Sequence, residues 1–192
     1  MGRLLHKALG IQRIMNDVIG LKRGTVVLKK HHKEWKEAFD AEKENLEKLL
    51  GDIVLDVQHI GSTAVPGLSA KPLIDMLMAV RSLSDVEVIR PILEKDGYKY
   101  RENGPNDEVK RLFVKGPEEK RTHHLHVTEL GSSVWKHDTA FRDWLLTHPE
   151  DVKTYEKLKQ KLAKEYAETR EFYTKGKYEF IEGILKKAEK EV

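Results

Sequence analysis

The chain has 192 residues and a nearly balanced charge, with 35 lysines and arginines against 32 aspartates and glutamates. This length suits one domain with a sizeable core. The formal net charge of +3 argues against a dedicated duplex-binding protein, which would carry a marked basic excess. The absence of cysteine excludes disulfides and thiolate metal sites and fits a reducing cytoplasm. No stretch approaches the roughly 18 consecutive apolar residues of a membrane span, so we expect a cytoplasmic protein without a membrane partner.

The first quarter of the chain predicts a helical extension, a short strand and a helix. Apolar residues at roughly helical spacing predict an N-terminal extension over residues 1–22 that contains an amphipathic helix. A single domain is expected over residues 23–192, and it opens with a short strand at residues 25–28. One apolar stripe then predicts a scaffold helix that ends at Gly51, a residue typical of the position after a helix.

Two apolar runs, residues 53–60 and 73–80, have the length and the Val/Ile content of buried strands. The loop between them is rich in glycine and proline, which resist regular structure. Asp75 falls inside the second run, where an unpaired charge would be expensive. Metal binding is the leading explanation for this acid, and a satisfied buried aspartate is the alternative.

The loop between these two strands carries the residues expected to bind phosphate. Gly61 and Ser62 follow the first strand directly, and backbone N–H groups can approach a phosphate there because glycine has no Cβ. Thr63 adds a further small donor, and Lys71 adds a point charge of the kind that binds phosphate. Three other cations are weaker candidates, since most such residues only solvate a surface: Arg111, Arg142 and Lys177.

The remaining chain continues with strands and then becomes helical. Capping residues, turn residues and apolar periodicity predict the following elements: a helix at 85–96, strands at 98–100, 111–115 and 122–128, and helices at 133–147, 152–166 and 180–185. The apolar stripes of the last three helices, within a helical part at about 132–190, are those of core-facing helices rather than cofactor sites.

Histidines alternate along the strand expected at residues 122–128. Strand alternation places His124 and His126 on one face, while His123 belongs to the opposite face. Two imidazoles at this spacing can contact one cation, and a carboxylate from a neighbouring strand would complete a facial arrangement. We therefore consider Asp75, His124 and His126 candidate metal ligands. The alternative is that the histidines only form hydrogen bonds across a polar sheet face.

The sequences of these segments resemble those of the uncharacterised GrpB family. Residues 59–68 run His-Ile-Gly-Ser-Thr-Ala-Val-Pro-Gly-Leu and residues 70–75 run Ala-Lys-Pro-Leu-Ile-Asp, and further similarity lies at 121–127 and 140–143. The resemblance covers about residues 20–188. It implies a nucleotidyltransferase-superfamily fold of the α/β (α+β) class, a mixed sheet flanked by helices with the C-terminal helices packed on it. The substrate of the family is not established, so the resemblance implies the fold better than the reaction.

One acid that nucleotidyl transfer requires is missing. Two carboxylates near the triphosphate hold the Mg²⁺ ions that neutralise the attacking and leaving oxygens. In the superfamily these acids stand two residues apart on one strand, but here Leu77 follows Asp75, as in GrpB-like sequences. One aspartate and two histidines suit Mn²⁺, Zn²⁺ or Fe²⁺ better than Mg²⁺. We expect at most one divalent metal ion per chain.

Two functions remain open at this point. The first is metal-dependent transfer of a nucleotidyl or phosphoryl group to a small acceptor, with Asp75, Ser62 and Lys71 as catalytic residues. The second is a non-catalytic module that binds a nucleotide or phosphorylated metabolite. Leu77 favours the second function, while the pair of histidines favours the first. The expected partner is a small phosphorylated molecule rather than specific nucleic acid, and a homodimer is an open alternative to a monomer.

Overall fold

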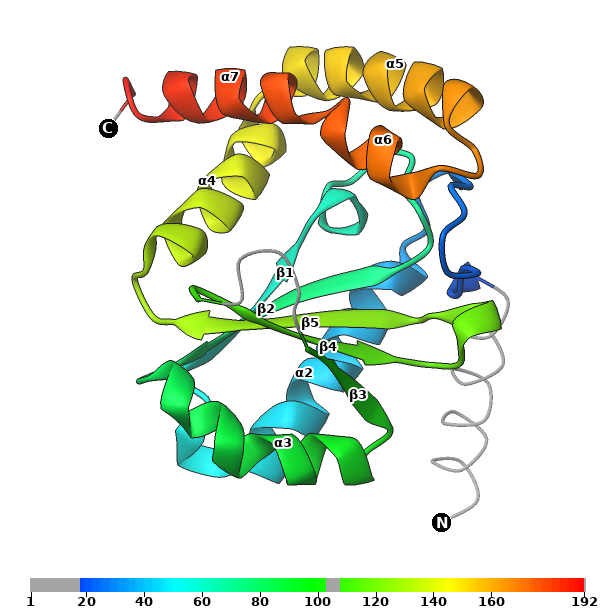
Figure 1. Ribbon diagram of the computed structural model, residues 1–192. Helices are drawn as coiled ribbons and strands as arrows, with labels where there is room; N and C mark the ends of the chain where they lie inside the picture. The colour runs from blue at the N-terminus through cyan, green and yellow to red at the C-terminus, as the bar shows by residue number, and fades with distance from the viewer. Residues whose placement is uncertain (1–17, 103–107, 192) are drawn as a thin grey trace, which may run out of the picture.

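A five-stranded mixed sheet lies between two helical layers in the computed structural model, which describes residues 18–102 and 108–191 (Figure 1). The strands are β1 (Asp56–Ile60), β2 (Ile74–Val80), β3 (Tyr98–Arg101), β4 (Arg111–Lys115) and β5 (His123–Glu129). Their order across the sheet is β1-β2-β5-β4-β3. Among these five strands, β2 and β5 form the only parallel pair, and the other neighbours are antiparallel. The predicted α/β (α+β) class with a mixed sheet is confirmed.

Helices cover both faces of this sheet (Figure 1). One face packs against α2 (Glu34–Leu50) and α3 (Val86–Lys95). The helices on the other side all follow the last strand: α4 (Ser133–Thr147), α5 (Pro149–Glu165), α6 (Arg170–Lys175) and α7 (Tyr178–Ala188). Within residues 18–102 and 108–191, no helix is both long and apolar enough to cross a membrane.

Alternation along β2 divides the two faces of the sheet. Ile74, Met76 and Met78 belong to the largest apolar core, which they share with residues of α2 and α3. Because successive side chains of a strand point to opposite faces, Asp75 and Leu77 face the C-terminal helices. The chemistry-bearing residues of β2 are therefore turned toward the helical layer formed by α4 to α7.

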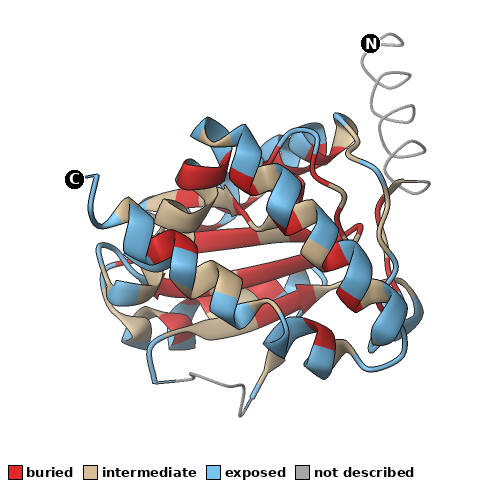
Figure 2. Cartoon of the chain, turned by 90° about the horizontal axis from the view of Figure 1, so that it is seen from above, coloured by how far each residue is buried: buried red, intermediate tan, exposed pale blue. Residues whose placement is uncertain are grey.

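The helical layer packs on the loop that joins β1 to β2. Val65 and Leu68 from this loop share a second apolar core with Trp144 of α4, Tyr155 of α5 and Ile184 of α7. Viewed from above, the buried central strands lie beneath and between the exposed outer faces of these helices (Figure 2). The loop is thus enclosed between the sheet and the helices, as a structural part of the interior.

Residues 25–28 do not form the strand predicted for them. Val26 packs against Leu162 and Tyr173 of the helical layer. Its backbone N–H donates to the carbonyl of Ala167 at 2.8 Å, so its partner is a connection between helices and not a strand. A short apolar run shows that a segment will be buried, but the run alone does not show which element will cover it.

The amphipathic helix predicted within residues 1–22 falls largely on residues 1–17, which lie outside the described part of the chain. The end of this extension is described. Ile19 is buried in the main core, and the backbone of Leu21 pairs with that of Arg121 in an isolated bridge. Residues 18–21 therefore pack on the same unit as the sheet.

Substituting Leu77 tests whether the missing acid can be restored. The Leu77 side chain is fully buried beside His126 on β5. We expect Leu77→Asp to lower the free energy of unfolding by about 3 kcal/mol, because it buries a carboxylate without a partner. Leu77→Met keeps the volume and should cost less than about 1.5 kcal/mol. Urea denaturation of both variants measures the difference, and an aspartate variant as stable as the methionine variant would contradict the prediction.

Candidate functional site

A carboxylate–imidazole pair joins the two central strands. The parallel register places Asp75 of β2 directly beside His124 of β5. Nδ1 of His124 lies 3.0 Å from Oδ1 of Asp75, and the two side chains are 10% and 29% exposed. Burial by itself would raise the pKa of Asp75, but the hydrogen bond from His124 and the charges of His124 and Lys71 hold that pKa well below its ordinary value. The carboxyl of Asp75 is therefore ionised at neutral pH.

His126, the third predicted metal ligand, lies on the same face but does not join this pair. Its ring centroid is 6.5 Å from that of His124, with the ring planes nearly perpendicular. Its Nδ1 atom is buried and has no hydrogen-bond partner among the described residues. Burial and the charge of Lys110 lower the pKa of His126 to about 4, so the ring is neutral. In residues 18–102 and 108–191, no three His, Asp or Glu side chains are grouped so that they could hold a metal ion.

Gly61 lets the loop approach the Asp75 carboxylate closely. Its φ of +69° lies in the left-handed region that favours glycine. A Cβ at this position would lie only 2.9 Å from Oδ2 of Asp75. Ser62 follows at the start of a short 3₁₀ turn. The predicted phosphate-binding pair is thus placed beside the predicted acid.

His59 and Thr63 hold the loop in shape. The Thr63 hydroxyl donates to the carbonyl of Leu73 at 3.2 Å, so Nε2 of His59, at 3.0 Å, donates to the hydroxyl oxygen. The His59 ring stacks on Phe39 with centroids 4.7 Å apart, and burial lowers its pKa to about 4. The Thr63 hydroxyl is therefore already engaged within the protein, while His59 braces the loop.

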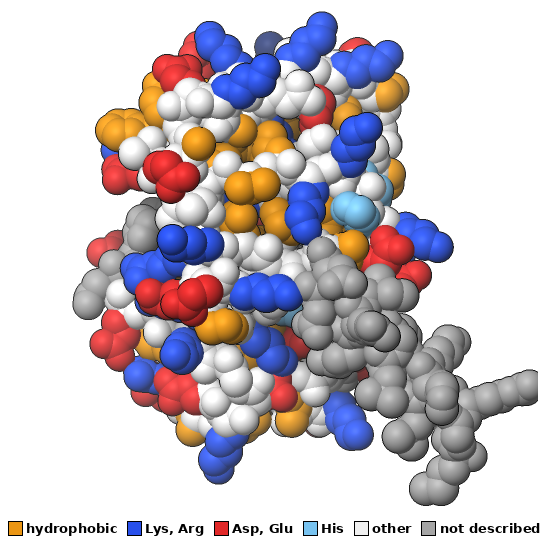
Figure 3. All heavy atoms as spheres, turned by 90° about the vertical axis from the view of Figure 1, so that its right-hand side faces the viewer, with side chains coloured by type: hydrophobic (Ala, Val, Ile, Leu, Met, Phe, Trp, Pro, Cys, Tyr) orange, Lys and Arg blue, Asp and Glu red, His pale blue; other side chains and the backbone are white. Residues whose placement is uncertain are grey.

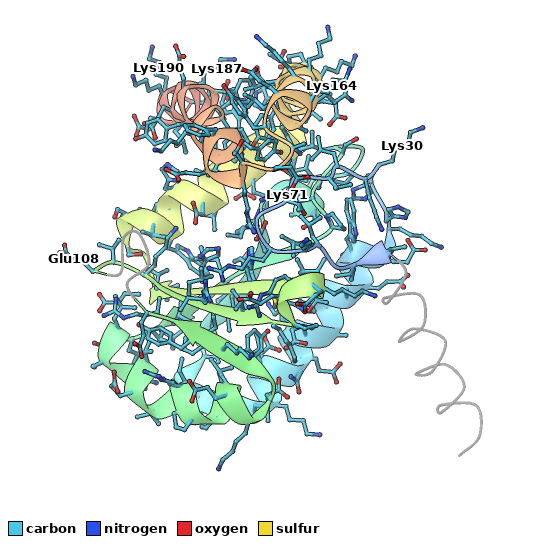
Figure 4. The ribbon with its side chains drawn as sticks, turned by 45° about the vertical axis from the view of Figure 1, so that its right-hand side comes forward. Lys30, Lys71, Glu108, Lys164, Lys187 and Lys190 are labelled. Atoms are coloured by element: carbon cyan, nitrogen blue, oxygen red, sulfur yellow. The ribbon has the colours of Figure 1, made fainter. Side chains whose placement is uncertain are left out.

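Two lysines lie near the ring of Tyr173, and neither forms an ion pair with another described residue. Nζ of Lys71 and Nζ of Lys177 lie 5.6 Å and 4.7 Å from the ring centroid. Burial, then the charges of Arg170 and Lys177, hold the pKa of Lys71 well below its ordinary value. Burial also lowers the pKa of Lys177 to about 8, although Asp75 acts in the opposite direction. Figure 4 shows Lys71 between the sheet and the helical layer, whereas Lys164 points outward.

A clamp from α5 holds the middle of the loop. The Ser69 backbone N–H donates to Oε2 of Glu156 at 2.9 Å, and the Ser69 carbonyl accepts a hydrogen bond from Nζ of Lys159. Lys159 is fully buried, and burial together with the charge of Lys177 lowers its pKa to about 7. Both backbone groups of Ser69 are thus bound by one helix, which fixes the chain two residues before Lys71.

Two of the weaker phosphate candidates lie elsewhere. Strand alternation places Arg111 on the face of β4 that carries Phe113 in the main core, away from Asp75. Arg142 of α4 donates to the Gln58 side chain at 2.6 Å and to a β1 carbonyl at 3.0 Å, at the outer edge of the sheet. The structure brings neither arginine to the cation cluster, in contrast to Lys177.

Similarity to known proteins identifies the family of this chain. Residues 25–187 match the family model described as GrpB protein. The chain belongs to the GrpB family. It is 38% identical over 171 residues to the glutamate-rich protein GrpB of Alkalihalophilus pseudofirmus. This alignment covers 88% of this chain and 98% of that protein. The conserved protein GrpB from Enterococcus faecalis has a solved structure with a TM-score of 0.79 at 34% identity, covering 86% of this chain and 98% of that one.

The resemblance predicted from the motifs is therefore confirmed, and the solved GrpB structure supports the fold. A more distant structural likeness is to the Cid1 poly(U) polymerase, with a TM-score of 0.47 and 15% identity over 80% of this chain and 45% of that one. A likeness at this distance says nothing about the reaction of the GrpB chain.

Sequence reasoning missed part of this GrpB site. Lys159 occupies the apolar stripe of α5 between Tyr155 and Leu162, and a lysine at such a position is a signal that could have identified it. Arg170 follows a turn after α5 and carries no comparable signal. The effect of its charge on Lys71 depends on how α6 packs, which no local pattern shows.

Gly61 provides a test of the close contact with Asp75. We expect Gly61→Ala to destabilise the protein more than Gly67→Ala, because both positions have positive φ but only the first new Cβ meets another side chain. Positive φ alone should cost about 1 kcal/mol in each variant. Urea denaturation gives both values. Equal losses of stability would show that the predicted contact with Asp75 has no energetic effect.

Proposed function

We propose that this GrpB chain binds a phosphorylated small molecule, either a nucleotide or a phosphorylated metabolite, between β2 and the helical layer. One observation carries the proposal. Lys71 and Lys177 lie near the ring of Tyr173, the charge of Arg170 acts on both lysines, and none of the three forms an ion pair with another described residue. Buried or partly buried like charges repel one another, so an arrangement of this kind calls for an anion between them.

The loop supplies the donors that a phosphate would need in addition to charge. Gly61 and Ser62 lie beside Asp75 at the end of β1, and Gly61 has no Cβ of its own to keep a phosphate from the backbone. Lys71 comes from the same loop and points into the space between the layers (Figure 4). Phosphate oxygens would accept from these groups, while the clamp of Ser69 by α5 holds the loop in position.

A small ligand fits the charge distribution better than a nucleic acid duplex. On the visible part of the face in Figure 3, lysine and arginine side chains are scattered among acidic and apolar ones rather than gathered into one stripe. A protein that binds duplex DNA concentrates its positive charge along the phosphate backbone. Lys71 and Lys177, by contrast, lie against the buried ring of Tyr173.

Transfer of a nucleotidyl or phosphoryl group to a small acceptor is the second candidate function, and the Asp75–His124 pair favours it. When Nδ1–H of His124 donates to Asp75, Nε2 of a neutral ring is an acceptor. An imidazole oriented by a carboxylate can take a proton from an acceptor hydroxyl. Ser62 and Lys71 would then position the transferred group.

Binding of ATP and pyrophosphate tests the proposal. We expect both to raise the melting temperature and to bind in isothermal titration calorimetry, whereas adenosine should not. Lys71→Met and Lys177→Met should each weaken binding by at least about tenfold, since each removes a cation from the cluster. Lys164→Met is the matched control, because Lys164 is exposed on the outer side of α5. The proposal is wrong if neither phosphorylated compound binds, or if the control loses as much affinity.

Anion binding should weaken as the pH rises. Burial lowers the pKa of Lys159 to about 7 and that of Lys177 to about 8 in the free protein. A bound phosphate favours the charged forms and raises both pKa values, so binding takes up protons between about pH 7 and 9.5 and affinity falls across this range. Lys177→Arg should flatten the profile because arginine does not titrate there. Calorimetry of pyrophosphate binding at several pH values measures the pH dependence of affinity in the unmodified protein and in Lys177→Arg. The same pH dependence in both proteins would contradict the prediction.

A further inference from the structure

We infer that the phosphorylated ligand of this site is bound without a divalent metal ion, its charge being neutralised by Lys71, Arg170 and Lys177. This inference rests on the proposed function. It concerns the source of the counter-charge, which in a nucleotidyltransferase would come from metal ions held by carboxylates.

Few oxygen donors are available for a metal ion on this face of the sheet. Mg²⁺ requires near-octahedral coordination by oxygen, usually from carboxylates, phosphates and water. Position 77, which faces the same side as Asp75, holds a fully buried leucine that cannot act as a ligand. Asp75 is the only carboxylate that β2 directs to this face, because the strand contains no other acid.

Both carboxylate oxygens of Asp75 already contact protein groups. Its Oδ1 atom is engaged by Nδ1 of His124 at 3.0 Å, and its Oδ2 atom lies against the backbone of Gly61. The ring of His126 stands apart, 6.5 Å from His124 between centroids. Asp75 and His124 thus form a hydrogen-bonded pair inside the protein, and the described residues include no group of three side chains that could bind a metal ion.

The charges near Lys71 are mostly positive. The charges that act most on Lys71 are those of three cations, Arg170, Lys177 and Lys159, and of one acid, Asp75. The other carboxylate of this region, Glu156, is bound to the backbone N–H of Ser69. A divalent ion would add positive charge to a region where cations already outnumber acids, and this repulsion disfavours it. A phosphate group provides the opposite charge and three or more acceptor oxygens for the same donors.

The cations are also held in place before a ligand arrives. Lys71 follows the clamped Ser69, and both Lys71 and Lys177 lie near the face of the buried Tyr173 ring. Donors that are already oriented lose less entropy on binding, so the ligand does not need a metal ion to organise its phosphates. The positive charge that would neutralise the phosphate thus comes from the loop after β1 and from the chain around α6.

Calorimetry of pyrophosphate and ATP in EDTA, and then in excess Mg²⁺ or Mn²⁺, tests the inference. We expect affinity in EDTA to equal or exceed that with metal, because a metal complex of the ligand carries less negative charge for the lysines to attract. Lys177→Gln should lose at least about tenfold in EDTA, and Lys177→Arg should retain most of the affinity because it keeps the charge. Melting curves of the free variants establish that each one is folded.

A second measurement examines the metal directly. Titration of the free protein with Mn²⁺ alone, followed by electron paramagnetic resonance, should show no binding tighter than about 1 mM. Phosphate binding that occurs only with a divalent ion would overturn the inference while leaving the proposed function intact. Tight Mn²⁺ binding to the free protein would overturn it too. Absence of binding in both EDTA and metal would instead refute the proposed function, and the inference with it.

Discussion

The Asp75 carboxylate lies within a buried strand, and the structure around it follows from the need to satisfy that charge. His124 provides the partner because the parallel register sets the two residues side by side on adjacent strands. Gly61 provides the room, since any larger residue would meet the carboxylate. One acid therefore links β2, β5 and the loop after β1, and the position of that loop in turn places Lys71.

The helical layer completes the site rather than merely covering it. Glu156 and Lys159 of α5 bind both backbone groups of Ser69, so the loop is held from above as well as from the sheet. The same layer contributes Lys177 and the buried ring of Tyr173. A ligand between the layers would contact groups from segments more than 100 residues apart in sequence, and its binding would stabilise the packing of helices on sheet.

Charge distinguishes the proposed phosphate site from a carboxylate-based metal centre. An acidic pair attracts divalent ions, which then attract phosphate, whereas a lysine cluster attracts phosphate directly. Leu77 stands where a second acid would otherwise lie, so the positive charge of the lysines near Tyr173 is left uncompensated. The cost is borne in the free protein, where burial and mutual repulsion lower the pKa values of Lys71 and Lys177.

The sequence by itself determined the strand at residues 73–80 and the common face of Asp75 and His124, because strand alternation and apolar periodicity are local properties. It also determined the family, through short motifs in this same region. Only the tertiary structure decided which cations converge. Arg142 was a candidate and is bound to the edge strand β1, while Arg170 was not a candidate and its charge acts on Lys71. The position of a helix-borne side chain depends on how distant helices pack against the loop, and no local pattern encodes that packing.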